Sequence, residues 1–218
     1  MGKISILTPD QKAFLAGLKK NHYFCDNFYF TGGTALAEYY LSHRLSEDLD
    51  FFSDKRFDNH RVLGGIRDLS KLLNFSFNSH FAEPAYSFFL KFSSHSPTKI
   101  DFGFFPYPRL GKRLKKQGIL IDSQLDIAVN KLMTISQRTD IKDFVDLYFL
   151  LDKYSFWDLF RGVEAKFKQE LNPLIIASDF LKIEEFNFLP KMIRSLELED
   201  LKIFYRKLAK RLGKKSLQ

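Results

Sequence analysis

Hydrophobic positions in the first 120 residues alternate between helical and strand-like spacing. The run TPD at residues 8–10 predicts a helix start, because threonine caps helices and proline is tolerated in the first helical turn. Phe14, Leu15 and Leu18 then form an apolar stripe. The further elements expected here are a short strand within residues 23–30, a helix over 34–41, a strand over 48–52, a helix over 59–73, and strands over 75–81, 86–92 and 99–104, the last two paired antiparallel through residues 93–98.

The pattern changes after residue 120, where strand signals fade and helical spacing dominates. Helices are expected over residues 123–136, 141–153, 156–169 and 199–212, with a further segment inside 175–194. The sequence thus predicts an α+β protein in two domains. Residues 1–120 would form a mixed sheet with helices, and residues 121–218 a C-terminal helical bundle.

The composition is that of an ordinary globular chain, with 218 residues, 45% of them hydrophobic and 28% charged. The single cysteine, Cys25, excludes a disulfide framework and a cysteine-based zinc site. No apolar run reaches the roughly 18 residues of a membrane span, and the first ten residues lack the apolar core of a signal peptide. We therefore expect a soluble, cytoplasmic protein without a membrane partner.

The net charge of +8 is unevenly distributed along the chain. From residue 201 to the end, seven basic residues occur without an acidic one, and a second basic cluster lies between residues 109 and 116. Such clusters attract polyanions such as nucleic acid, although a solvated helix face has the same composition. The residues concerned are Arg109, Lys112, Arg113, Lys115, Lys116, Lys202, Arg206, Lys207, Lys210, Arg211, Lys214 and Lys215.

Residues 30–52, FTGGTALAEYYLSHRLSEDLDFF, contain two features of nucleotide chemistry. Gly32 and Gly33 open an expected helix, where the backbone can approach an anion and free N–H groups face it. Thr34 adds a hydroxyl for a phosphate oxygen. Asp48 and Asp50 stand two apart on an expected strand, so their carboxylates share a face and favour a bound Mg2+. Each feature alone also fits an ordinary strand-to-helix turn or scattered surface acids.

Asp101 supplies a third carboxylate, on the strand expected over residues 99–104. If this strand lies beside the one that carries Asp48 and Asp50, the three acids share a face. Three carboxylates can hold two Mg2+ ions, which stabilise the attacking and leaving oxygens of an in-line displacement at phosphorus. The alternative is an acid at a strand end that binds no ligand.

Four segments, in order, resemble a known family. The run GGTALAEYYLSHRLSEDLDFF is similar to motif I of the AbiEii/AbiGii-type nucleotidyltransferase toxins, which belong to the polymerase-β-like superfamily. The run KID at residues 99–101 resembles the short motif with the third acid, and AVNKL at 128–132 resembles the motif with a helical lysine. Arg138 with KDFVDL at 142–147 resembles the final R-x-KD-x-x-D-L motif, although Arg138 stands four residues before Lys142 rather than two. The resemblance covers residues 28–152.

The resemblance implies an N-terminal nucleotidyltransferase core that binds a metal and a nucleotide. The expected cofactor is Mg2+, with Mn2+ as the alternative, and the substrate is an NTP such as ATP or GTP. Asp101 would complete the metal site or take the proton of the acceptor hydroxyl. The implied metal ligands are Asp48, Asp50 and Asp101, and the implied nucleotide-binding residues are Gly32, Gly33, Thr34, Arg44, Ser46 and Lys131.

The resemblance also implies that the helical domain completes the cleft. Lys131 would contact the triphosphate, and Asp143 or Asp146 would assist the acceptor or position Lys131. His43 is expected to brace the metal-binding strand together with Arg44 and Ser46. From the residues alone, Lys131 also fits a solvated lysine, and the two acids also fit dipole support near a helix start. The implied catalytic residues are Asp48, Asp50, Asp101, Lys131, Asp143 and Asp146.

The leading hypothesis is Mg2+-dependent transfer of an NMP from an NTP to an acceptor hydroxyl, with release of pyrophosphate, by the toxin of a toxin–antitoxin pair. The expected acceptor is the 3′ end of a tRNA, since the basic segments can hold its phosphates. A cognate antitoxin is the expected protein partner. Two alternatives stay open: transfer to a hydroxyl of a protein or of an aminoglycoside-like small molecule, and a nucleotide- or RNA-binding module without catalysis.

Overall fold

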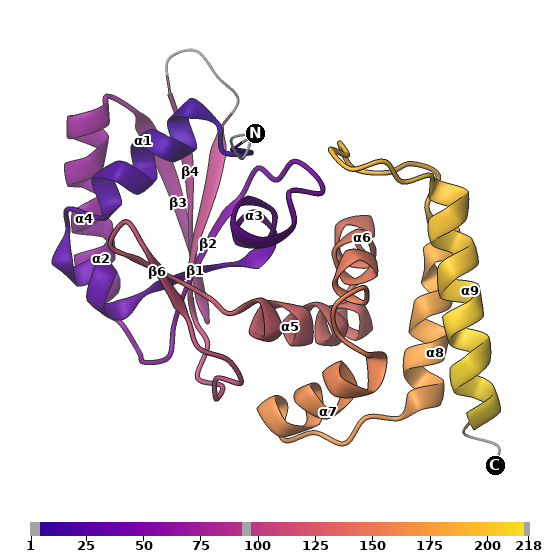
Figure 1. The fold of residues 1–218 in the computed structure, drawn as a ribbon. Coiled ribbons are helices and arrows are strands. Elements are labelled where there is room, and N and C mark those ends of the chain that lie inside the picture. Colours follow the sequence, from indigo (N-terminus) through magenta and orange to yellow (C-terminus); the bar gives the residue numbers. More distant parts are fainter. Residues whose placement is uncertain (1–4, 93–96, 216–218) are drawn as a thin grey trace. The chain divides into compact units, whose positions relative to one another are not determined.

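The computed structural model describes residues 5–92 and 97–215 (Figure 1). The chain folds into two compact units. The first consists of Met1–Ser42, Ser46–Pro108 and Lys112–Ser123 and contains the sheet. The second consists of His43–Leu45, Arg109–Gly111 and Gln124–Gln218 and is helical. Two short segments that come before residue 112 therefore belong to the second unit.

The first unit is built on a seven-stranded mixed sheet with strand order β3-β4-β5-β2-β1-β7-β6. The pairs β2–β5 and β1–β7 are parallel, and the other neighbouring pairs are antiparallel. The expected antiparallel pairing of β4 with β5 is confirmed, while residues 93–96 of their link lie outside the described residues. The strands are β1 (Tyr29–Thr31), β2 (Leu49–Ser53), β3 (Ser76–Ala82), β4 (Ala85–Lys91), β5 (Thr98–Phe104), β6 (Leu114–Lys116) and β7 (Ile119–Ile121).

Three helices of this unit, α1, α2 and α4, lie on one side of the sheet (Figure 1). They meet a row of buried phenylalanines, in which the ring centroid of Phe51 lies 6.5 Å from Phe14 and 5.3 Å from Phe102. Because side chains alternate along a strand, Asp50 and Asp101, which directly precede Phe51 and Phe102, point to the opposite face. The helices are α1 (Pro9–Leu18), α2 (His22–Asn27), α3 (Gly32–Leu36), the π-helical η1 (Ala37–Leu41) and α4 (Asn59–Leu73).

Local sequence signals set most of these boundaries. Thr8 and Gln11 form a capping box at the start of α1, and α4 spans the expected residues 59–73. The strand expected within residues 23–30 is only partly right, because residues 22–27 are helical and the strand begins at Tyr29. The side chain of Asn21 starts that helix by accepting a hydrogen bond from the backbone N–H of Tyr23. The sequence analysis did not predict the β6–β7 hairpin, whose strands are three residues long.

The second unit contains the expected helical bundle, so the α+β class is confirmed. The helical segment expected inside residues 175–194 is found over residues 173–185, and the chain after it pairs with residues 43–45. The backbone N–H of Leu45 donates to the carbonyl of Lys191 at 2.8 Å, and Arg44 forms a β-bridge with Met192. The elements are α5 (Gln124–Gln137), α6 (Ile141–Leu150), α7 (Phe156–Phe167), α8 (Pro173–Leu181), the 3-10 helix η2 (Lys182–Glu185) and α9 (Leu198–Lys215).

Across residues 5–92 and 97–215, no helix combines the length and the apolar character that a bilayer span requires.

Candidate active site

The glycine turn lies directly against one of the acidic residues. Gly32 follows β1 and has a φ of +74°, a left-handed conformation that glycine adopts without strain. A Cβ atom at this position would lie 1.9 Å from Oδ2 of Asp50, so any other residue would collide with that carboxylate. Gly32 therefore permits the turn into α3 and also leaves the space that the Asp50 carboxylate occupies.

Asp50 and Asp101 are neighbours across the parallel strands β2 and β5, where they share the same register. Residues opposite one another on adjacent strands point to the same face, about 5 Å apart at the backbone. Asp48 lies one residue before β2 and is exposed. In the described residues, no group of three or more His, Cys, Asp or Glu side chains is arranged as metal ligands. The sheet therefore brings two of the three acids together, with the third at the start of one strand.

Lys99 shares the face of β5 that carries Asp101, because two residues separate them on a strand. Its ammonium lies 2.7 Å from Oδ2 of Asp101. Burial lowers the pKa of Lys99, but the hydrogen bond to Asp101 and the charges of the nearby aspartates outweigh it, so this pKa is raised. Oδ1 of Asp101 is buried and has no hydrogen-bond partner within the described residues. A buried carboxylate oxygen of this kind fits a hard cation such as Mg2+.

Thr34 and Ser46 support the loop that leads into β2. The buried Thr34 hydroxyl is hydrogen-bonded to the hydroxyl of Ser46 at 2.7 Å and to the backbone carbonyl of Asp48. The side-chain amide of Gln11 donates to the carbonyl of Glu47 at 2.7 Å. These bonds hold the backbone around Asp48 from both α1 and α3. The expected contact of Thr34 and Ser46 with phosphate would therefore have to compete with hydrogen bonds inside the protein.

Arg44 and Asp146 form the centre of a second cluster, which lies within the second unit. The Arg44 guanidinium is bidentate, donating from Nε to Oδ1 of Asp146 at 2.6 Å and from Nη2 to Oδ2 at 2.8 Å. Nε2 of His43 lies 2.6 Å from the same Oδ1, and none of the three side chains is more than 2% exposed. Burial opposes ionisation of Asp146, but Lys131 and Arg44 outweigh it and hold the pKa of Asp146 well below its usual range.

Lys131 extends this cluster to Asp143. Its ammonium lies 2.6 Å from Oδ1 of Asp143 and 2.6 Å from Oδ2 of Asp146. Burial lowers the pKa of Lys131, but the two carboxylates more than compensate, so this pKa is raised. Arg138, directly after α5, donates from Nε to Oδ2 of Asp143 at 2.8 Å. Its wider spacing from Lys142 therefore still lets Arg138 reach Asp143.

The structure thus divides the residues singled out in the sequence between the two units. Arg44 was expected at the nucleotide and His43 at the metal-binding strand, yet the side chains of both bind Asp146. Lys99 also lies near the acids, although no role for it was predicted from the sequence. Its spacing of two residues from Asp101 on an expected strand could have indicated that the two side chains share a face. The first unit holds Gly32, Gly33, Thr34, Ser46, Asp48, Asp50, Lys99 and Asp101, and the second holds His43, Arg44, Lys131, Arg138, Asp143 and Asp146.

Comparison with known proteins identifies a family and a relative that match much of the chain. A family model described as "Nucleotidyl transferase AbiEii toxin, Type IV TA system" matches residues 13–212. The uncharacterized protein aq_aa25 of Aquifex aeolicus (strain VF5) is 37% identical over 139 residues. That match spans 62% of this chain and 62% of the curated relative.

Solved structures share the fold at low sequence identity. A putative nucleotidyltransferase from H. pylori superposes with a TM-score of 0.60 at 22% identity, covering 97% of this chain and 99% of that one. MenT4, the nucleotidyltransferase toxin Rv2826c from Mycobacterium tuberculosis H37Rv, has a TM-score of 0.53 at 15% identity, covering 93% of this chain and 84% of that one. These likenesses confirm the nucleotidyltransferase-like fold. Because the family match extends over most of its length, the chain belongs to the AbiEii nucleotidyl transferase toxins of type IV TA systems, as the sequence motifs predicted.

Proposed function

We propose that this protein transfers an NMP from an NTP to an acceptor hydroxyl, that the reaction depends on Mg2+, and that the acceptor is a tRNA. The observation that carries the proposal is the contact between the glycine turn and the Asp50 carboxylate. A glycine turn at a helix start, where backbone N–H groups can face a phosphate, lies beside a carboxylate that can bind a cation. This is what a metal-bound triphosphate requires.

The glycine turn and the three acids of the first unit each have a part in this proposed reaction. The backbone N–H groups of Gly32 and Gly33 would hold the β- and γ-phosphates. Asp48, Asp50 and Asp101 would hold Mg2+, which supplies charge stabilisation to the attacking and leaving oxygens. The acceptor hydroxyl forms a bond to the α-phosphorus, the bond to pyrophosphate breaks, and the hydroxyl proton passes to the Asp101 carboxylate. Pyrophosphate carries away the electron pair of the broken bond.

In the second unit, we propose that the Arg44–Asp146 cluster positions the segment between η1 and β2. Arg44 and His43 fix residues 43–45 through Asp146, and Lys131 joins Asp146 to Asp143. The polar atoms concerned are largely engaged with one another, and the cluster is buried. Its effect on the reaction would then come through the conformation of the loop that carries Asp48.

The test is label transfer from NTPs to tRNA in the presence of Mg2+. Wild type should label tRNA, and Asp48→Ala should lower turnover by orders of magnitude. Asp68→Ala on α4, an exposed acid with the same charge change, should leave turnover unchanged. If no tRNA is labelled and Asp48→Ala behaves like wild type, the proposal is wrong.

The same assay separates the other acceptors. Label on a protein or on an aminoglycoside, with tRNA unlabelled, would retain the chemistry and replace the acceptor. RNA binding with a steep salt dependence and no turnover would identify a binding module. We further propose a cognate antitoxin as the protein partner, on the strength of the family alone. Its binding would be detected by co-purification of this chain with a co-expressed candidate antitoxin.

A further inference from the structure

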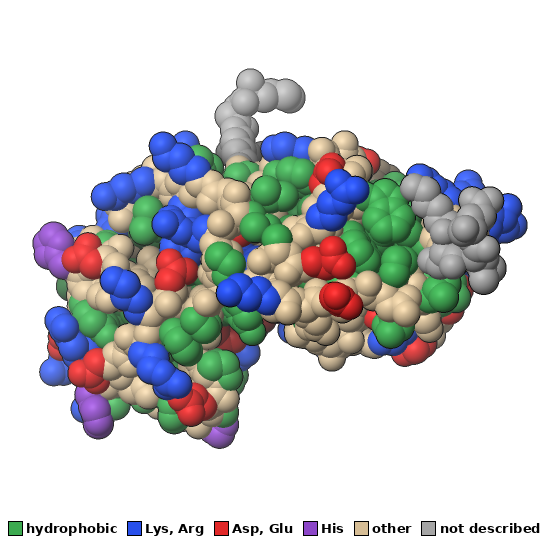
Figure 2. All heavy atoms as spheres, turned by 90° about the horizontal axis from the view of Figure 1, so that it is seen from below, with side chains coloured by type: hydrophobic (Ala, Val, Ile, Leu, Met, Phe, Trp, Pro, Cys, Tyr) green, Lys and Arg blue, Asp and Glu red, His purple; other side chains and the backbone are tan. Residues whose placement is uncertain are grey.

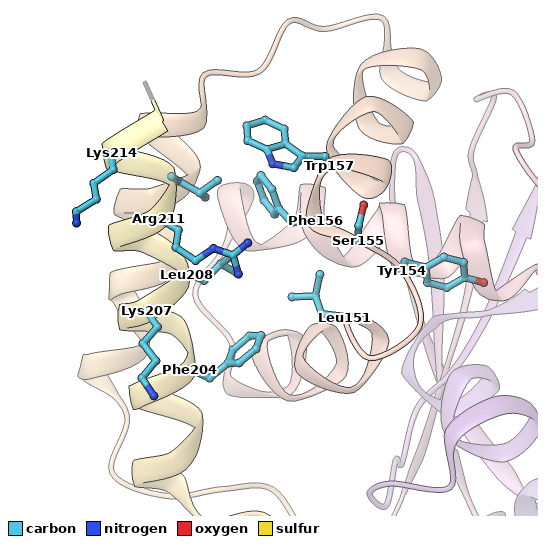
Figure 3. A pocket seen from close by; sticks show the side chains of 11 residues that line it. Leu151, Tyr154, Ser155, Phe156, Trp157, Phe204, Lys207, Leu208, Arg211 and Lys214 are labelled. Carbon is cyan, nitrogen blue, oxygen red and sulfur yellow. The ribbon is translucent and has the colours of Figure 1, made fainter. Parts of the chain in front are cut away.

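The second unit contains a pocket that the proposed reaction does not use. It has a volume of about 670 Å³ and lies between the end of α6, the start of α7 and one face of α9 (Figure 3). This volume is in the range of about 300–1,000 Å³ that small-molecule sites occupy. Its lining includes three aromatic side chains, Phe156, Trp157 and Phe204, and three basic ones, Lys207, Arg211 and Lys214.

Aromatic rings form the inner surface of this pocket. Phe156 and Trp157 project from α7 toward α9, and Phe204 projects from α9 (Figure 3). The ring centroids of Phe156 and Trp157 are 5.1 Å apart, and Phe204 packs against Tyr148 at 4.9 Å. Trp157 and Phe204 are only half-buried, so part of each ring faces the pocket. Such rings, held by their neighbours, offer flat surfaces on which another planar group can stack.

The rim of the pocket is basic. Lys207, Arg211 and Lys214 are four and three residues apart on α9, so they share one helix face. Arg211 extends toward Phe156, whereas the two lysines point outward at the rim (Figure 3). No acidic residue lines the pocket, and within the described residues Arg211 forms no ion pair.

Some arginines outside this pocket are paired with acidic side chains. Arg206, on another face of α9, is bound to Glu184 and Glu199, and Arg113 is bound to Asp54. On the face drawn in Figure 2, basic side chains mostly occur singly or in small groups among acidic and hydrophobic ones. On that face the basic side chains therefore form no continuous patch, and the α9 face is set apart by its position around an aromatic pocket.

We infer that this pocket binds unpaired nucleotides of an RNA strand. One base would stack on Trp157 and another on Phe204, at the opposite end of the pocket, and the phosphates between them would bind Arg211 and the rim lysines (Figure 3). Aromatic stacking combined with basic side chains is how proteins hold single-stranded nucleic acid. An acidic peptide would match the charge but would leave the flat aromatic surfaces without a planar partner. The inference rests on the proposed function only in naming RNA as the source of the nucleotide.

Trp157 is the protein's single tryptophan, so its fluorescence reports directly on the pocket. We would titrate the full chain with a short single-stranded RNA and no NTP or metal. The RNA should quench Trp157 emission, and an abasic oligonucleotide of equal length and charge should not. Free AMP should quench only at much higher concentration, because it lacks the flanking phosphates. Poly-glutamate should not quench. Quenching by poly-glutamate equal to that by RNA would overturn the inference in favour of an acidic protein partner.

Variants on α9 provide a matched comparison. Phe204→Leu should weaken RNA binding by roughly tenfold, as expected for the loss of one stacking surface. Arg211→Ala should reduce the slope of log K against log salt by about 0.7, the value for one phosphate contact on a single strand. Lys210→Ala removes the same charge from the same helix but outside this pocket, and it should preserve quenching and most of the affinity.

If Arg211→Ala and Lys210→Ala lowered RNA affinity equally and Phe204→Leu did not change it, the inference would be overturned. RNA binding would then be explained by the general positive charge of α9. This outcome is distinguishable from failure of the proposed function. Asp48→Ala should abolish transfer and retain Trp157 quenching, whereas an absent pocket site would leave wild-type transfer without quenching.

Discussion

Gly32→Ala should uncouple the turn that we propose binds phosphate from Asp50, the acid that we propose binds the metal. The new Cβ atom would stand 1.9 Å from Oδ2 and 2.7 Å from Cγ of Asp50, whereas contacts under 3.0 Å are essentially never seen. The carboxylate therefore has to retreat by about 1 Å, and a displacement of that size at a reacting group costs roughly a hundredfold in rate. The φ of +74° adds a conformational cost of about 1–2 kcal/mol for alanine.

The assay combines turnover, Mn2+ binding and thermal unfolding. We expect turnover to fall by about two orders of magnitude, Mn2+ affinity to fall, and the melting temperature to drop by about 2–8 °C for a chain of this length. Gly64→Ala is the matched control, because a Cβ atom at Gly64 in α4 meets nothing within 4 Å. It should leave turnover unchanged and stabilise the helix by up to about 1 kcal/mol.

Wild-type turnover and Mn2+ affinity in a folded Gly32→Ala protein would refute the reasoning. So would an equal loss of turnover in Gly64→Ala, because the effect would then not come from the contact with Asp50.

Three further predictions concern the charged clusters. Asp146→Asn leaves Arg44 and Lys131 buried without their shared carboxylate, and it should lower the unfolding free energy measured by urea titration by about 3–5 kcal/mol. The exposed control Asp152→Asn should lower it by less than about 0.5 kcal/mol. Burial of Asp146 raises its pKa, but Lys131 and Arg44 outweigh this effect, so the pKa of Asp146 is lower in the folded than in the unfolded protein. The ionised Asp146 therefore stabilises the fold fully above the unfolded pKa of about 3.9, and this stabilisation is lost as the pH falls through the lower folded pKa. The urea midpoint of wild type should therefore fall more steeply with acidification than that of Asp146→Asn. Lys99→Ala removes the ammonium that competes for Asp101 and should raise Mn2+ affinity about two- to fivefold by calorimetry, whereas weaker binding would contradict this competition.

Much of the fold follows from short-range signals. The capping residues before α1 and the apolar stripe of α4 each lie within a short stretch of sequence. The positions of these two helices could therefore be predicted from the sequence. The errors fall on elements that are too short for periodicity to be informative. A short strand was expected within the aromatic residues 23–30, but Asn21 caps a short helix over residues 22–27 and the strand begins only at Tyr29. The strands of the β6–β7 hairpin have only three residues each.

The acidic face of the candidate site was partly predictable. The spacing of Asp48 and Asp50 predicts that both point to one side of the chain, and this is a local property, although Asp48 lies one residue before β2. The addition of Asp101 depends on β5 lying beside β2 in register, which is a property of the sheet. The same holds for the contact of Gly32 with Asp50, since β1 and β2 must pair antiparallel to bring the turn and the carboxylate together.

The sequence by itself determined the family, the α+β class and the glycine and aspartate residues of motif I, because these depend on residue type and spacing along the chain. Only the tertiary structure decided what the charged residues bind. Arg44 and Lys131 read in the sequence as cations available to a triphosphate, but both are buried against Asp146. The physical reason is that a buried charge requires a nearby counter-charge, and the partner of Arg44 comes from a helix about a hundred residues away in the chain.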